Sequence, residues 1–231
     1  MAGLSALDMV NPYLSDRRQL ICTELAILLP NTEAVIASNS KATSARFKEW
    51  TGHTQQSLED AWKAEGFTKD AKTGSWTRPA SGPVTTSCEG LIGQIFNKIE
   101  SAGFGKRRGG GVTSFSLPGN DKYGKEPATP PPGWHWFRDK TSAVRPRAGD
   151  LFQIGRLVAP RQWYHHHVGV ITGWVDGENP SWETVEAGQG GPGTGFDFIK
   201  RKGWRPLNPV DVRSPAKVLM GWLDIDEYFA K

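Results

Sequence analysis

Apolar residues recur at helical spacing through the first third of the chain. Three segments with one apolar face are separated by proline or glycine: residues 17–29, 41–50 and 57–65, followed by Pro30, Gly52 and Gly66. None of these segments has the spacing of a chemical motif. The pattern therefore predicts a helical part, residues 1–83, whose role is to pack on the rest of the chain.

A fourth helical pattern follows, and it begins close to a cysteine. Its apolar positions share one face: Leu91, Ile92, Ile95, Phe96, Ile99 and Ala102. Thr86 and Glu89 have the Thr-x-x-Glu spacing of a capping box, in which the two side chains satisfy N–H groups at a helix start. The pattern predicts a helix that begins here, with Cys88 in its first turn, and that ends at Gly103.

Beyond this helix the pattern changes from helical to extended. Residues 103–146 contain a run of three glycines and a run of three prolines, with little apolar periodicity, which predicts a long loop. Five short segments rich in β-branched and aromatic residues follow: residues 150–154, 165–174, 182–187, 195–199 and 217–223. They predict an antiparallel sheet. We therefore expect an α+β fold in which N-terminal helices pack on a core of residues 84–231, as one compact unit.

The composition is ordinary for a globular protein and excludes several classes. The 231 residues have a net charge of +4, and the basic residues are scattered apart from residues 106–108, so a nucleic-acid partner is not expected. The longest apolar run, residues 25–29, is far too short for a membrane span. Residues 1–12 lack a basic start followed by an apolar run, so no standard export signal is predicted.

Cys88 is the candidate nucleophile. Cys22 and Cys88 are the only cysteines, too few for a disulfide framework or a cysteine-based zinc site, and Cys22 lies in an apolar helical run that places it in the core. Unpaired N–H groups at a helix start favour an anion, so a cysteine at that place is well suited to act as a thiolate. An inert, partly buried Cys88 and a disulfide with Cys22 are the alternatives.

A cysteine nucleophile needs a base, and histidine suits that role. His165, His166 and His167 open a predicted strand, where alternation places His165 and His167 on one face and His166 on the other. We expect His167 to be the base, with His165 as the alternative. Adjacent histidines can also bind zinc, but no third ligand stands at local spacing, so neither a metal nor another cofactor is expected.

The next predicted strand offers a group to orient the imidazole. It contains or precedes Glu183, Glu186 and Gln189, and antiparallel pairing can bring Glu186 level with His167. Glu186 is the first choice and Gln189 the alternative for this third position. An exposed acidic residue at a strand end would give the same pattern.

Taken in order, these pieces resemble the NlpC-type cysteine peptidases and the related CHAP amidases of the papain-like superfamily. Residues 87–91, Ser-Cys-Glu-Gly-Leu, are similar to the family's Asp-Cys-Ser-Gly-Leu signature. Residues 146–151 are similar to its Pro-Gly-Asp-Leu motif, and residues 167–171 to its His-Val-Gly-Ile strand. The resemblance covers residues 84–190 and implies a papain-like fold with Cys88 as nucleophile, His167 as base and Glu186 as orienting group. Ser87 replaces the usual aspartate, and the loop at 103–146 is unusually long.

The resemblance also implies a function, because members of this family mostly cleave amide bonds in bacterial cell-wall peptides. Without an export signal or a wall-binding repeat, the chain is similar to antibacterial toxins that a type VI secretion machine delivers from the producer's cytoplasm into the periplasm of rival cells. Such an effector implies a peptidoglycan peptide as substrate, with an immunity protein and the secretion apparatus as partners. The alternatives are a papain-like acyltransferase, a protein-cleaving toxin and a non-catalytic binding module.

Overall fold

The structure is a computed structural model that describes residues 14–80, 84–108, 124–125, 130–137, 144–159, 162–177, 180–207 and 218–230. The helices in these ranges are α1 (Asp16–Leu28), α2 (Ser44–Thr51), α3 (Gln55–Ala64), α4 (Cys88–Ser101) and the short α5 (Ile225–Tyr228). The strands are β1 (Val35–Ala37), β2 (Thr68–Lys69), β3 (Trp76–Thr77), β4 (Lys106–Arg107), β5 (Gly124–Lys125), β6 (Trp134–Trp136), β7 (Leu151–Ala159), β8 (Gln162–Val175), β9 (Ser181–Glu186), β10 (Phe198–Pro206), β11 (Val218–Leu223) and β12 (Phe229–Ala230).

Most strands belong to one antiparallel sheet. Its order is β1-β10-β9-β8-β7-β11-β6, and β5 also pairs with β8. The long strands β7 and β8 form its centre, with Leu151 opposite Val170 and Phe152 opposite Gly169. Two small ladders, β2 with β3 and β4 with β12, lie outside it. The predicted α+β architecture with an antiparallel sheet is confirmed.

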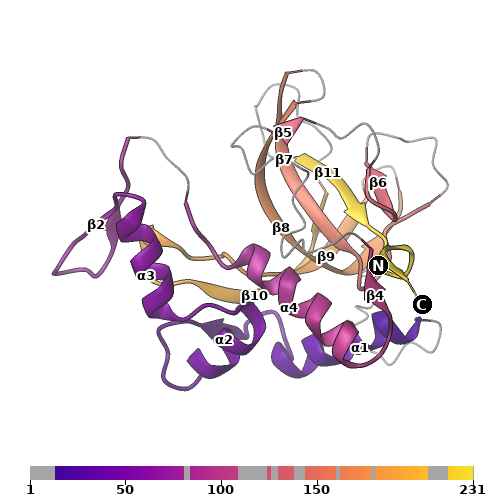
Figure 1. The fold of residues 1–231 in the computed structure, drawn as a ribbon, viewed down its shortest axis with the longest axis horizontal. Helices are drawn as coiled ribbons and strands as arrows, with labels where there is room; N and C mark the ends of the chain where they lie inside the picture. The colour runs from indigo at the N-terminus through magenta and orange to yellow at the C-terminus, as the bar shows by residue number, and fades with distance from the viewer. Residues whose placement is uncertain are drawn as a thin grey trace.

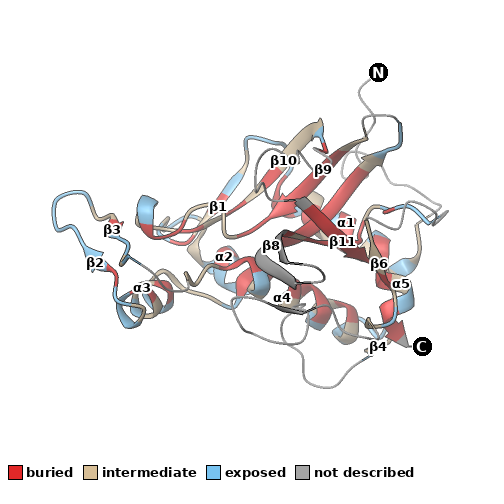
Figure 2. Cartoon of the chain, turned by 90° about the horizontal axis from the view of Figure 1, so that it is seen from above, coloured by how far each residue is buried: buried red, intermediate tan, exposed pale blue. Residues whose placement is uncertain are grey.

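Helix α4 lies in the core between the sheet and the other long helices. Figure 1 shows α4 beside the sheet, with α1 and α2 on its other side, and the buried residues of Figure 2 are concentrated in α4 and the central strands. One apolar cluster joins side chains from all these layers, including Leu25, Phe47, Leu91, Phe96 and Val170. Since Cys88 is the first residue of α4, this packing fixes the place of its thiol.

The predicted helices are all present, each within a few residues of its expected bounds. Among the strands, the segment predicted at residues 195–199 is displaced, because β10 begins only at Phe198. A 3₁₀ turn at Pro192–Thr194 ends at Gly195, whose φ of +78° is left-handed. A side chain at Gly195 would lie 2.5 Å from the carbonyl oxygen of Gly74, so this stretch is held as a tight turn rather than a strand.

The prediction of an unstructured loop at residues 103–146 is wrong for part of that range. Strand β4 pairs with β12, β5 with β8, and β6 adds to the sheet edge, where Trp136 lies opposite Gly221. Each partner is far away in the sequence, so local periodicity gave no sign of these strands. The glycine run at 109–111 lies outside the described residues. Where the chain is described, no helix has the length and apolar character needed to cross a membrane.

A buried arginine ties α1 to the opposite end of the chain. The Arg18 side chain is 1% exposed, and its guanidinium lies 2.7 Å from an oxygen of Asp150, 2.9 Å from Asp224 and 2.7 Å from Asp226. Burial raises the pKa of Asp150 to about 6, even though Arg18 favours its charged form. The network therefore holds three carboxylates that would be costly to bury alone.

Replacing Arg18 should destabilise the fold strongly. We expect Arg18→Ala to lower the free energy of unfolding by about 3–5 kcal/mol, because it leaves the buried Asp150 carboxylate without its cation and leaves Asp224 with Arg147 alone. Urea unfolding of the variant measures this loss. The control is Arg46→Ala, which removes one exposed hydrogen bond to the Ile27 carbonyl and should change stability by about 0.5 kcal/mol or less. Equal effects of the two changes would refute the structural role of the network.

Candidate active site

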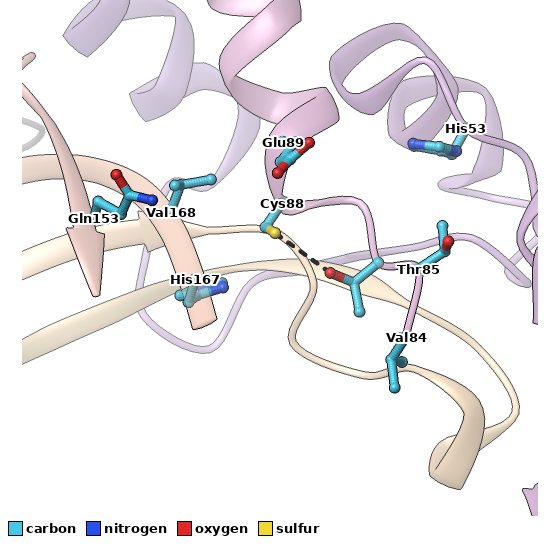
Figure 3. Close-up of a pocket in the computed structure, with 9 residues that line it drawn as sticks. His53, Val84, Thr85, Cys88, Glu89, Gln153, His167 and Val168 are labelled. Carbon is cyan, nitrogen blue, oxygen red and sulfur yellow. Dashed lines mark hydrogen bonds between the residues drawn. The ribbon is translucent and has the colours of Figure 1, made fainter. Parts of the chain in front are cut away.

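Cys88 occupies the first position of α4, as the sequence predicts, but the helix is capped differently. Its thiol side chain is only partly accessible, with 8% of the residue exposed. The predicted capping box is wrong: Ser87 is the N-cap residue, and no side chain makes a cap hydrogen bond. The Ser87 hydroxyl instead donates to Asp197, and the Thr86 hydroxyl shares a 3.3 Å hydrogen bond with the Cys88 sulfur, the dashed line in Figure 3.

His167, on β8, faces the start of α4. Cys88 and His167 line the same pocket, the thiol raises the pKa of the His167 ring, and Nε2 of that ring donates to Oε2 of Glu186 over 2.9 Å. Because Nε2 is engaged by Glu186, Nδ1 is left for the thiol. The structure thus brings together the three predicted site residues, Cys88 from a helix and the other two from neighbouring strands.

The sheet register explains how Glu186 reaches the imidazole. Val170 of β8 lies opposite Val185 of β9, so Glu186 and His167 are diagonal neighbours on the same face. Gly169, between them, must lack a side chain, since a Cβ there would lie 2.7 Å from the Phe152 ring. Glycine at this position therefore lets the Phe152 ring of β7 lie directly against the backbone of β8.

The electrostatics of the pair favour a charged imidazole. Burial opposes the charge on His167, but its interactions with Cys88 and Glu186 outweigh burial and raise the pKa of His167 to about 9. Burial would likewise raise the pKa of Glu186, yet its hydrogen bond and charge interaction with His167, together with Lys202, hold that pKa well below its usual range. Glu186 is therefore an anion, and His167 a cation, at neutral pH.

Glu186 is at the centre of a wider network of donors. Oε1 accepts hydrogen bonds of 2.6 Å from both Thr184 and Arg205. Oε2 lies 2.8 Å from the Lys202 ammonium and 3.1 Å from Nε2 of Gln189. Gln189, the alternative third residue, is thus bonded to Glu186 and lies 3.1 Å from the His167 ring nitrogen. Both candidates for the third position, Glu186 and Gln189, therefore contact the His167 ring, and the Glu186 carboxylate is fixed by donors on several sides.

A second carboxylate, Asp197, joins the start of α4 to the sheet. It is fully buried, and its Oδ2 accepts hydrogen bonds of 2.9 Å from both the N–H and the hydroxyl of Ser87. Its Oδ1 accepts from the N–H groups of Gly190 and Phe198. Asp197 therefore holds the residue before the cysteine against the loop that follows β9.

Two pockets meet beside Cys88. Thr86 and His167 line both of them. The first pocket has a volume of about 390 Å³ and is the one drawn in Figure 3: Cys88 faces it from the helix start, His167 from the strand below, and Gln153 from β7. The second, of about 530 Å³, lies on the side of Glu186 and is also lined by Lys202 and Arg205. Cys88 lines the first pocket, and Thr86 and His167 connect that pocket to the second.

The other predicted candidates lie elsewhere. Cys22 and Cys88 are both free thiols, and burial raises the pKa of Cys22 in the core to about 12. Glu183 lies on the opposite face of β9, where it binds Arg201 over 3.0 Å and accepts from the Thr172 hydroxyl.

The remaining histidines of the predicted triple fall on an irregular part of β8. The side chains of His165 and His166 lie outside the described residues. The ladder steps from Ile154 opposite His167 to Gly155 opposite His165. This bulge interrupts the strict alternation on which their assignment to faces depended.

Sequence reasoning missed Asp197, Lys202 and Arg205. Asp197 stands between two phenylalanines in a turn, and its partner Ser87 is 110 residues away. Only Lys202 could have been found, because the pairing of β9 with β10 places it opposite Thr184, close to Glu186. That register could not be derived before the bulge between Lys202 and Arg205 was known.

One other cluster has the composition of a metal site. The ligand atoms of His135, Asp224 and Glu227 lie within 4.8 Å of one another. However, the Asp224 carboxylate already binds Arg18 and Arg147, over 2.9 and 2.6 Å. A cation there would have to displace two arginines, so we do not assign a metal to it.

Comparison with protein-family models, with curated proteins and with solved structures finds no match for this chain. Its function is therefore argued from the geometry of the site.

The contact between Gly188 and the cysteine allows a sharp test of the site's geometry. Gly188 has a φ of +70°, and a Cβ there would lie 2.9 Å from Oγ1 of Thr86 and 3.2 Å from Cβ of Cys88. We expect Gly188→Ala to slow alkylation of Cys88 by iodoacetamide several-fold, because it displaces the thiol.

Gly74→Ala is the matched control for this change. Gly74 has nearly the same φ, +72°, with nothing within 4 Å of the added Cβ. Both variants therefore bear a similar backbone strain of about 1–2 kcal/mol, but only Gly188→Ala should change the alkylation rate. Equal rates in the two variants would show that the loop does not position Cys88.

Proposed function

We propose that the protein is a papain-like cysteine hydrolase that cleaves an amide bond of bacterial peptidoglycan. The observation that supports this most is the juxtaposition of three groups: the Cys88 thiol and the His167 ring line one pocket, and the ring is hydrogen-bonded on its other side to the Glu186 carboxylate. A nucleophile, a base and an orienting group in this order are the arrangement that acyl transfer needs.

In the first half of the proposed reaction, Nδ1 of His167 holds the proton of Cys88, and the thiolate attacks the carbonyl carbon of the amide. The resulting oxyanion lies near the start of α4, where the first N–H groups have no partner within the helix. The imidazolium then gives its proton to the nitrogen of the scissile bond. That bond breaks, a free amine leaves, and Cys88 bears the acyl group as a thioester.

In the second half, water replaces the amine. His167 takes a proton from the water, the hydroxide oxygen attacks the thioester carbon, and the C–S bond breaks. The products are a carboxylic acid and the free Cys88–His167 pair. Glu186 remains an anion throughout, because its role is to hold the ring and stabilise its charge, as the low pKa of Glu186 requires.

The substrate assignment depends on the motif order of the sequence together with the cleft. Two adjoining pockets of about 390 and 530 Å³, joined at Thr86 and His167, provide room for several residues of a branched peptide near the thiol. We propose accordingly that the chain acts as an antibacterial effector with a cell-wall peptide as substrate. An immunity protein would then have to cover this cleft in the producer.

Digestion of purified sacculi tests the proposal. The wild type should release soluble peptide fragments identifiable by mass, and Cys88→Ala should release none, because the nucleophile is absent. The matched control is Cys22→Ala, which removes a thiol that is buried in the core and 3% exposed, and should keep its activity.

The same assay can contradict the substrate assignment. A folded wild type that releases nothing from several wall chemotypes, while a thioester with a lipid acyl donor forms at Cys88, would favour an acyltransferase. Toxicity confined to the cytoplasm would favour a protein-cleaving toxin.

The elevated pKa of His167 predicts the pH dependence of turnover. The ring is protonated below about pH 9 and loses its proton above it, so the initial rate of digestion should fall as pH rises through about 9. Glu186→Gln removes the carboxylate that favours the charged ring and should move this decline to lower pH, by about one to three pH units. A pH profile of the initial rate measures both.

The control for this profile is Glu33→Gln, which removes one exposed negative charge. It should leave the alkaline decline where it is in the wild type. A decline that stays near pH 9 in Glu186→Gln would mean that His167 is not the group that titrates.

A further inference from the structure

The two pockets that share Thr86 and His167 differ in charge. The second pocket is lined by Lys202 and Arg205, whose side chains are 35% and 31% exposed, and Glu186 is the one carboxylate among its described lining residues. Two permanent cations therefore face one anion, and the charged His167 ring adds to the excess. Among the described residues that line the first pocket there is no lysine or arginine, and Glu89 is its one carboxylate.

The Arg205 guanidinium of the second pocket is held by several contacts. The Arg205 guanidinium donates to Thr184 over 2.9 Å as well as to Glu186, and it lies 5.0 Å from the centre of the Trp182 ring. Stacking on an aromatic ring leaves the edge of a guanidinium able to bind a further acceptor. Trp182 is in turn packed edge-on against Phe152 at 4.8 Å, so its ring is a rigid support.

The rest of the second pocket fits an aliphatic acidic side chain. Its other walls include Ile154, Pro206, Leu207 and Leu219, which are apolar. A ligand with a short hydrocarbon stem and a terminal carboxylate can place the stem on these walls and the charge between the two cations. Glu186 cannot neutralise both of them, so the carboxylate of a ligand supplies the missing negative charge.

We propose that the Lys202–Arg205 pocket is a subsite for an acidic residue of the substrate, and that the Glu89 pocket, which Cys88 itself lines, takes the neutral or cationic part of the substrate. The difference in charge between the two pockets would then fix the orientation in which a peptide binds. This rests on the proposed role of Cys88 as the reactive centre, but it adds a requirement on the substrate that the catalytic residues do not impose.

Affinity alkylation of Cys88 tests the subsite without any need for turnover. The probes are N-bromoacetyl-glutamic acid α-amide and its neutral isostere, N-bromoacetyl-glutamine α-amide. We expect the wild type to react about fivefold faster with the acidic probe, the ratio that one partly exposed charge pair provides. Lys202→Gln and Arg205→Gln should each bring the ratio of the two rates close to one, and added salt should reduce it in the wild type.

The neutral probe is the internal control, because it reports any disturbance of the Cys88–His167 pair in the variants. Lys63→Gln removes the same charge from an exposed position on α3 and should keep the wild-type ratio. A wild-type ratio near one, or a ratio that Lys202→Gln and Arg205→Gln leave unchanged, would overturn the subsite. Failure of the reactive centre would look different: both probes would then label Cys88 no faster than an ordinary exposed cysteine.

Discussion

The place of the Cys88 thiol depends on one buried carboxylate, Asp197. It accepts four hydrogen bonds, two from Ser87, the residue before the cysteine, and one each from Gly190 and Phe198. Hydrogen bonds to an ionised acceptor are stronger than those between neutral groups. The start of α4 is thereby held against the loop after β9, which also brings Gly188 into contact with Cys88.

Buried charge is used in the same way in three other places. Arg18 binds three aspartates between α1 and the C-terminal part, Arg201 binds Glu183 on one face of β9, and Glu186 is surrounded by donors on the other. Such groups add little net stability compared with an apolar core, since their desolvation offsets the attraction. Their effect is on geometry, because each buried charge is satisfied only when the segments that supply its partners are arranged in one way.

Features that depend on local sequence patterns can be predicted from the sequence, whereas those that depend on contacts between distant segments cannot. Cys88, His167 and Glu186 were identified because a helix start and two strands are local patterns, and antiparallel neighbours place side chains within reach. The capping box at Thr86 failed because its hydroxyl is bonded to the Cys88 sulfur and that of Ser87 to Asp197, neither of which periodicity can show. Strand β6 was missed for the same reason, since its partner β11 is distant in sequence.

The network around Glu186 links the strength of the base to the choice of substrate. The Glu186 carboxylate interacts with the His167 ring and with two cations. Lys202 and Arg205 therefore keep Glu186 ionised but weaken its attraction for the imidazolium. An acidic ligand bound to those cations would draw their positive charge toward itself. Glu186 would then interact more strongly with His167, and the proton would be retained until the leaving amine takes it. A substrate of the right charge would therefore improve the catalytic pair that acts on it.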